Sequence, residues 1–429
     1  MKKIKYLVGT LLLTGSFVLM GCNDDDVAMT QVNATLNISC NIGNDLTVKT
    51  GSYTFTNVST GTETTVDYGA TLTRAAAEST LASLTDGLYN VAFVGTATYT
   101  YTETQIVDKE EVEVEKSAEV NIQGSQQNVE VKGGNVALNL TVYVQNKDEK
   151  GNFVIAEIFS GGSLYPETNR QYNGDQYIRI YNNSSETLYA DGLVLLESKF
   201  STTQKFEYTP DIMAEAMVAQ SVVRIPGSGK EHPVLPGESI ILCDNAINHT
   251  EALPSSIDLS NADFEWYTIG TSSLPDVDNP DVPNMEMLFN YSLTIWVLSK
   301  QGNRAYAIGR IPENISAETY IKDYEYKATY ENAGKTMPLN NAYSFPNEWI
   351  IDAVNLSPKS AYVWNVVSPA LDMGYSYIGE RTTVVENAGK AVVRKVSYTT
   401  EDGRTVLQDT NNSSVDFQAS VRATLLPAQ

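Results

Sequence analysis

The sequence predicts an all-β protein built from two successive β-sandwich units. Residue types that favour strands are frequent, and 25 of the 429 residues are Tyr. Short stretches such as Ala34–Cys40 alternate between apolar and polar residues with a period of two, the pattern of a half-buried strand. Turn signals such as Asp86-Gly87 separate these stretches. A chain of this length is expected to form two or three domains.

The first unit is predicted over residues 34–146. Strand-like stretches recur at 34–40, 47–58 and 84–93, and this spacing is typical of a sandwich. The last stretch, Leu84–Phe93, contains the pattern L-x-D-G-x-Y-x-V. This pattern resembles the transthyretin-like modules of secreted bacterial proteins. The resemblance implies a transthyretin-like or immunoglobulin-like sandwich that serves as a spacer or an adhesion stalk.

The second unit is predicted over residues 153–429, after a polar, turn-rich boundary. Its strand patterns include V-I-x-E-I from Val154, Y-I-x-I-x-N from Tyr177 and P-G-E from Pro236. In this order they resemble a lamin-tail-like β-sandwich, and the segments between them are long enough to be loop insertions. Pro210–Gln220 begins with Pro-Asp and continues with good helix formers, which predicts a short inserted helix.

Most of the chain also resembles a family of Bacteroidota outer-membrane lipoproteins known as domain of unknown function 4876. The resemblance implies no established activity. It implies a setting beside TonB-dependent uptake systems, which is an association and not a mechanism. The residues that carry it are Tyr172–Tyr177, Tyr189–Leu193, Ile225–Gly229, Asp258–Glu265 and Asp409–Ser413.

The first 33 residues predict an exported, lipid-anchored protein. Residues 1–21 contain a basic start, an apolar stretch and a small residue before Cys22, a pattern typical of a lipoprotein signal peptide that leaves Cys22 to carry lipid. Residues 22–33 should form a flexible acidic tether. The run Asn23–Asp26 resembles the surface-export signal of Bacteroidota lipoproteins, which implies an outer-membrane protein that faces the cell exterior.

Two alternatives to this localisation stay open. The leader is also compatible with a plain secretory signal in which the cysteine is incidental. The acidic run is also compatible with a solvated tether that no export receptor recognises, which would leave the anchor facing the periplasm.

The charge of the chain restricts its partners. The formal net charge is −23, and loss of residues 1–21 would remove three lysines and no acid. A surface this negative argues against nucleic acid and against electrostatic binding to anionic lipid. It favours cations, basic partners or an uncharged ligand. Two cysteines remain besides Cys22, and we expect Cys40 and Cys243 to be buried small side chains rather than a disulfide.

An acidic loop predicts a cation site. Asp276, Asp278 and Asp281 lie within six residues of one another, near two prolines that restrict the backbone. Hard cations take several oxygen ligands, so these carboxylates are candidate Ca²⁺ ligands. The loop lacks the Gly and the closing Glu of an EF-hand. The alternative is that these side chains cap turns through nearby backbone amides.

The same long excursion contains further candidate ligand-loop residues. They are His249, Asp263, Glu265, Trp266 and Tyr267. Trp266 and Tyr267 are the aromatic pair most expected to be exposed, as in a sugar-binding platform. His249 by itself does not supply enough ligands for a transition metal.

The sequence favours a binding or accessory protein that serves TonB-dependent uptake of nutrients, metal or haem. The alternative is an adhesion or surface-matrix component with the first unit as its stalk. A hydrolase acting on glycans is a third hypothesis. No catalytic motif stands out in the chain, so we do not expect an enzyme, and no cofactor is predicted apart from the Ca²⁺ hypothesis.

Overall fold

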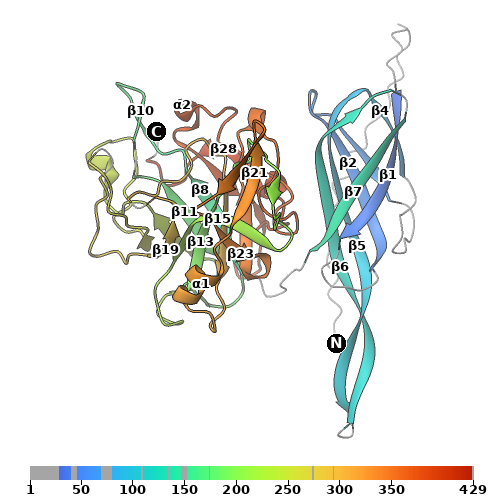
Figure 1. Cartoon of the computed structure of the whole chain (residues 1–429), viewed down its shortest axis with the longest axis horizontal. Helices are drawn as coiled ribbons and strands as arrows, with labels where there is room; N and C mark the ends of the chain where they lie inside the picture. Colours follow the sequence, from blue (N-terminus) through green and yellow to red (C-terminus); the bar gives the residue numbers. More distant parts are fainter. Residues whose placement is uncertain are drawn as a thin grey trace.

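The fold was analysed in a computed structural model (Figure 1). It describes residues 29–39, 46–68, 80–107, 110–133, 135–145, 152–172, 174–272, 275–292 and 294–427. The signal peptide, Cys22, the acidic run and Cys40 lie outside the described residues. Within the described part of the chain, no helix is long and apolar enough to cross a membrane.

The first unit is one seven-stranded sheet that folds around its own core. The strand order is β3-β2-β5-β6-β7-β1-β4, with β1 and β7 parallel and the other pairs antiparallel. Alternate side chains point inward, as the period-two pattern predicts, and Tyr53, Phe55 and Phe93 lie in the core. The strands are β1 (Met29–Ser39), β2 (Leu46–Asn57), β3 (Glu63–Asp67), β4 (Thr80–Thr85), β5 (Gly87–Val107), β6 (Glu110–Val131) and β7 (Asn135–Gln145).

Strands β5 and β6 continue beyond the rest of this sheet as a two-stranded ribbon (Figure 1). The strand β2 pairs with β5 only as far as Tyr99, and β7 pairs with β6 only over residues 121–123. Beyond these limits, residues 100–107 of β5 pair with residues 110–117 of β6, and among the described residues no third strand joins them. The ribbon gives the first unit its long axis.

The second unit is a sandwich of two larger sheets. The first has the order β18-β17-β11-β8-β25-β28, and the second has the order β19-β15-β13-β20-β24 with β23 also paired to β15. Their strands are β8 (Phe153–Phe159), β11 (Tyr177–Asn182), β13 (Leu193–Ser198), β15 (Ala216–Arg224), β17 (Ser239–Cys243), β18 (Phe264–Glu265), β19 (Glu286–Asn290), β20 (Ala305–Arg310), β23 (Tyr343–Pro346), β24 (Ile350–Asn355), β25 (Lys390–Arg394) and β28 (Phe417–Arg422).

Short elements decorate this sandwich. The strand elements are β9 (Leu164–Tyr165), β10 (Arg170–Gln171), β12 (Leu188–Tyr189), β14 (Tyr208–Thr209), β16 (Pro233–Val234), β21 (Ala328–Asn332), β22 (Lys335–Leu339), β26 (Val396–Thr399) and β27 (Thr405–Leu407). The helical elements are α1 (Ala317–Asp323), α2 (Val384–Asn387), α3 (Ser413–Asp416) and the 3₁₀ turns His249–Glu251, Asn347–Trp349 and Lys359–Ala361. The all-β sandwich class predicted from the sequence is confirmed.

The core of the second unit lies between its two large sheets. Ile155 on β8 and Ile178 on β11 meet Leu195 on β13 and Tyr306 on β20 in one apolar cluster. Every residue of β8 is buried because the strand is central in its sheet and covered on both faces. Cys243 is buried and unpaired, as predicted.

One buried ionic group connects the two sheets. Arg394 on β25 pairs with Asp352 on β24 and also with Asp409 and Asp416. Its Nε donates to the carbonyl oxygen of Ile155 on β8 at 2.7 Å. A guanidinium buried at this depth needs such partners, because an unpaired charge there would cost several kcal/mol.

The helix predicted over Pro210–Gln220 is wrong. Residues 213–215 form a turn that is closed by the amide of Ala216 donating to the carbonyl of Ile212 at 2.7 Å. The chain then enters β15, which is buried along almost its whole length between β13 and β19. Pairing and burial override the helix propensity of Ala and Met here. Short helices do occur, at α1, α2 and α3.

Candidate functional site

Four loops at one end of the larger sandwich enclose a pocket of about 330 Å³. They are the connections β8–β11, β17–β18, β18–β19 and β19–β20, each of which is a long excursion from the sheets. The pocket is lined by Tyr165, Arg170, Gln171, Tyr172, Gly174, Asp244, Asn245, Ile247, His249, Ala252, Thr268, Pro275, Asp276, Val277, Ile295, Trp296 and Val297. Its volume is at the small end of the range for ligand pockets in proteins.

The orientation of the His249 ring is fixed by two hydrogen bonds. Its Nε2 lies 2.9 Å from the main-chain oxygen of Asn245, and its Nδ1 lies 2.8 Å from the hydroxyl of Tyr172. A carbonyl oxygen only accepts, so Nε2 carries the proton and Nδ1 accepts from Tyr172. Burial lowers the pKa of His249. The ring is therefore neutral, and neither nitrogen is free to bind a metal.

Two carboxylates of the lining carry the main electrostatic character of the pocket. Burial raises the pKa of Asp244 well above its usual range, and the carboxylate of Asp276 raises it further. The indole of Trp266 and the ammonium of Lys300 oppose that rise. Burial likewise raises the pKa of Asp276, against hydrogen bonds from Thr268 that lower it.

Two polar atoms beside these carboxylates have no hydrogen-bond partner within the described residues. Oδ2 of Asp276 accepts from the amide and the hydroxyl of Thr268 at 2.7 and 2.6 Å, but its buried Oδ1 has no donor. The buried Nε1 of Trp266 lies near Asp244 without completing a hydrogen bond. Buried polar groups are nearly always paired, so these two atoms are exceptions that need a reason.

Trp296 forms one wall and is held from behind. Its Nε1 donates to Oε2 of Glu197 at 2.6 Å, and its ring lies 5.0 Å from that of Trp266 between centroids. Burial raises the pKa of Glu197 to about 7, although hydrogen bonds from Trp296 and Gln220 and the charge of Arg304 lower it. The position of Trp296 in the pocket wall therefore depends on a hydrogen bond to a buried carboxyl group, that of Glu197.

The exposure predicted for the Trp266 and Tyr267 pair is wrong for Trp266. Its side chain is fully buried in the core between the sheets, while Tyr267 is half-buried. The loop after β17 folds back so that β18 adds a parallel edge to the sheet, and this brings Trp266 inside. An aromatic sugar platform at this pair is therefore not formed.

The predicted acidic residues act mainly as acceptors for main-chain amides. Glu265 is buried, and its two oxygens accept from the amides of Ala246 and Asn279 at 2.8 and 2.9 Å. The carboxylate of Asp263 accepts from the amide of Ile241 at 2.7 Å. These bonds fasten the long loop to the sheet, which explains why carboxylates recur in it.

The three candidate Ca²⁺ ligands take separate partners. Asp276 bonds to Thr268, Asp278 accepts from the amide nitrogen of the Asn284 side chain at 2.8 Å, and Asp281 is exposed. Among the described residues they do not form a group whose ligand atoms lie within 4.8 Å of one another. Of the candidate site residues predicted from the sequence, two line the pocket, Asp276 and His249.

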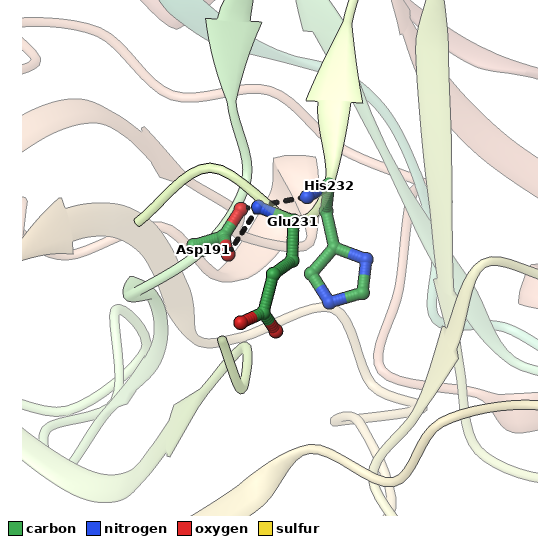
Figure 2. A group of neighbouring side chains, drawn as sticks. All are labelled: Asp191, Glu231 and His232. Atoms are coloured by element: carbon green, nitrogen blue, oxygen red, sulfur yellow. Dashed lines mark hydrogen bonds between the residues drawn. The ribbon is translucent and has the colours of Figure 1, made fainter. Parts of the chain in front are cut away.

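One other group of possible metal ligands does have its ligand atoms within 4.8 Å of one another. Asp191, Glu231 and His232 lie together at a turn (Figure 2). The oxygens of Asp191 accept from the amides of Gly229, Glu231 and His232 at 3.2, 2.9 and 2.8 Å. These amides lower the pKa of Asp191 although its burial alone would raise it. The carboxylate is already fully engaged in closing the turn, so the group is structural.

Sequence reasoning missed Asp244, Tyr172 and Trp296 as pocket residues. Asp244 directly follows β17, and a polar residue at the end of a buried strand is the signal that could have identified it. Tyr172 and Trp296 come from loops far away in the sequence, and no local pattern connects them to Asp244.

The fold and the pocket together define a β-sandwich protein with a small, partly acidic ligand-sized cavity. Residues 235–424 match the model of the family described as "Protein of unknown function (DUF4876)", so the family resemblance seen in the sequence is confirmed. The crystal structure of a DUF4876 family protein from Bacteroides thetaiotaomicron is similar, with 25% identity and a TM-score of 0.53. The similarity covers 93% of this chain and 96% of that one.

A second solved structure is from Bacteroides eggerthii and is provisionally described as a cell adhesion protein. It shares 10% identity with a TM-score of 0.14, over 76% of this chain and 81% of that one, and this likeness is too low for any inference. No curated protein matches the chain. Neither the family nor the fold assigns a catalytic activity.

Proposed function

We propose that this protein is a surface-displayed, lipid-anchored binding protein of the outer membrane that captures a small ligand for uptake. The observation that carries the proposal is the pocket among the four loops of the larger sandwich. It is ligand-sized, it contains buried ionisable groups, and one carboxylate oxygen of its lining, Oδ1 of Asp276, has no hydrogen-bond partner among the described residues. Pockets with a few convergent polar groups and perturbed pKa values are where binding sites are most often found.

The location is supported by the sequence alone. Cys22 would carry the lipid, and the acidic run after it would direct export to the cell exterior. The elongated first unit would then hold the pocket away from the membrane. Uptake through a TonB-dependent transporter is the finer part of the proposal, and it rests on the setting that the family resemblance implies.

The location is tested with two sets of substitutions. Cys22→Ala should leave an unlipidated precursor, detected by its slower migration and by loss of labelled-lipid incorporation. Replacing Asp24, Asp25 and Asp26 with Ala should protect the protein from protease added to whole cells. A triple variant that remains as protease-sensitive as the wild type would show that the acidic run is not the export signal.

The binding function is tested by obstructing the mouth of the pocket. Val277 lines the rim with an exposed side chain, so Val277→Phe should narrow the entrance without disturbing the core. Val396→Phe is the matched control, because Val396 is also exposed but lies on β26, away from the pocket lining. Both proteins are compared by growth of whole cells on limiting carbon, nitrogen and metal sources. We expect slower growth with Val277→Phe alone.

Normal growth of both variants under every limitation would contradict a role in uptake. All four tryptophans lie between residues 266 and 364, so intrinsic fluorescence reports on the second unit. Fluorescence titration of the purified wild type and the two variants then shows separately whether the pocket binds a ligand.

A further inference from the structure

The pocket lining points to a ligand class. We propose that the pocket takes a small organic cation, a primary ammonium with a short apolar part, whose charged group binds between Asp244 and Asp276. This inference rests on the proposed binding function and specifies its ligand.

The charges around the pocket favour a cation. Asp244 and Asp276 both line the pocket, and a third acid, Asp175, is buried next to it and acts electrostatically on Asp244. The half-buried Lys300 interacts with both Asp244 and Asp175, so one cation faces three acids. His249 is neutral, and Arg170 is exposed at the rim where water screens its charge. A bound cation would offset the excess of negative charge.

The hydrogen-bonding capacity of the lining favours a ligand that donates. The buried Oδ1 of Asp276 accepts from no described residue. Asp244 is buried, and the nearby N–H of Trp266 does not complete a hydrogen bond to it. Both carboxylates therefore retain capacity to accept. An ammonium group has three donors and no acceptor, which matches the two carboxylates of the pocket lining, Asp244 and Asp276.

The apolar part of the lining favours a ligand with a short hydrocarbon chain. Ile295, Trp296 and Val297 supply one side of the pocket, and the exposed Val277 supplies the rim. Ile269, next to the lining residue Thr268, is 73% exposed, the largest exposure among the bulky apolar side chains described. An apolar tail of a few carbons could contact these surfaces while the ammonium lies deeper.

A bare Ca²⁺ ion fits the pocket less well. Calcium takes six to eight oxygen ligands, and the lining supplies only two carboxylates. The side-chain oxygen of Asn245 is occupied by the amide of Val277 at 2.8 Å, and the hydroxyl of Thr268 already donates to Asp276. An organic cation supplies its own directional donors and needs fewer oxygens.

The test compares matched probes on the purified full mature chain. Butylammonium, its neutral analogue 1-butanol, glucose and Ca²⁺ are each titrated up to millimolar concentrations, followed by tryptophan fluorescence and calorimetry. We expect butylammonium to bind and the other three to leave both signals unchanged. Asp276→Asn and Asp244→Asn should each weaken butylammonium binding by roughly 30-fold or more, which corresponds to about 2 kcal/mol.

Asp281→Asn is the matched control, since Asp281 lies in the same loop but is exposed. It should bind butylammonium as the wild type does. If Asp244→Asn fails to fold, Asp276→Asn still decides the question, because Asp276 is only partly buried.

Several results would overturn the inference. They are equal binding of butylammonium and 1-butanol, binding of Ca²⁺ or glucose in place of butylammonium, unchanged affinity in Asp276→Asn, or no binding of butylammonium at all. If glucose or 1-butanol binds and Val277→Phe abolishes that binding, the ligand class is wrong while the proposed function stands. Growth defects specific to Val277→Phe would likewise preserve the proposed function when every probe fails.

Discussion

Replacing Glu197 with Gln should remove a pH dependence of stability that originates behind the pocket wall. Burial raises the pKa of Glu197 from 4.5 to about 7. The folded state therefore holds this proton more tightly than the unfolded state, so the contribution of Glu197 to stability is fully present below pH 4.5 and is lost as pH rises through 7. At 1.36 kcal/mol per pKa unit, the loss between pH 5 and pH 8 is about 2–3 kcal/mol.

Glu197→Gln keeps an oxygen that accepts from Trp296 but removes the titration. The free energy of unfolding is measured in urea at pH 5 and pH 8 by tryptophan fluorescence, for the variant and the wild type. Relative to the wild type, the variant should gain about 2–3 kcal/mol between the two pH values. Glu401→Gln, in an exposed turn, should gain nothing. An equal difference between Glu197→Gln and wild type at both pH values would refute the reasoning.

Two further substitutions test the turn closed by Asp191 and the buried ion pairs of Arg394 in the second unit. Gly227→Ala should destabilise it by about 1–3 kcal/mol more than Gly229→Ala, because both glycines have positive φ but only a Cβ at Gly227 would lie 2.1 Å from Oδ1 of Asp191; equal thermal midpoints would contradict this. Arg394→Met should cost about 3–5 kcal/mol in urea unfolding, because it leaves buried carboxylates unpaired. The exposed Arg381→Met serves as its control, and equal losses in both variants would show that the buried pairing is not the cause.

The class of fold was predictable because its signals are local. Alternation within a strand such as Leu46–Asn57 follows from one buried and one exposed face, and it can be recognised from a dozen residues. The helix prediction over Pro210–Gln220 failed because the strand that begins at Ala216 depends on partners elsewhere in the chain, Leu193–Ser198 and Glu286–Asn290. Its own residues favour a helix when taken alone.

The candidate site was only partly predictable for a related reason. The acidic character of the loop that contains Asp276 was visible in the sequence, but the partner of each carboxylate was not. Glu265 and Asp278 are engaged by an amide and a side chain, whereas Oδ1 of Asp276 is left without a donor. Trp266 was placed at the surface because a parallel edge strand as short as β18 leaves no periodic pattern.

The position of β8 affects how the second unit folds while the chain is being synthesised. This strand begins the unit in sequence, yet it lies at the centre of its sheet between β11 and β25. One edge is paired as soon as residues 177–182 have been synthesised, but the other waits for residues 390–394. An apolar strand edge that stays open during synthesis invites pairing with other chains. We therefore expect the nascent chain to need a holding chaperone. We also expect a fragment that begins at residue 235, where the family match begins, to aggregate because it lacks β8 and β11.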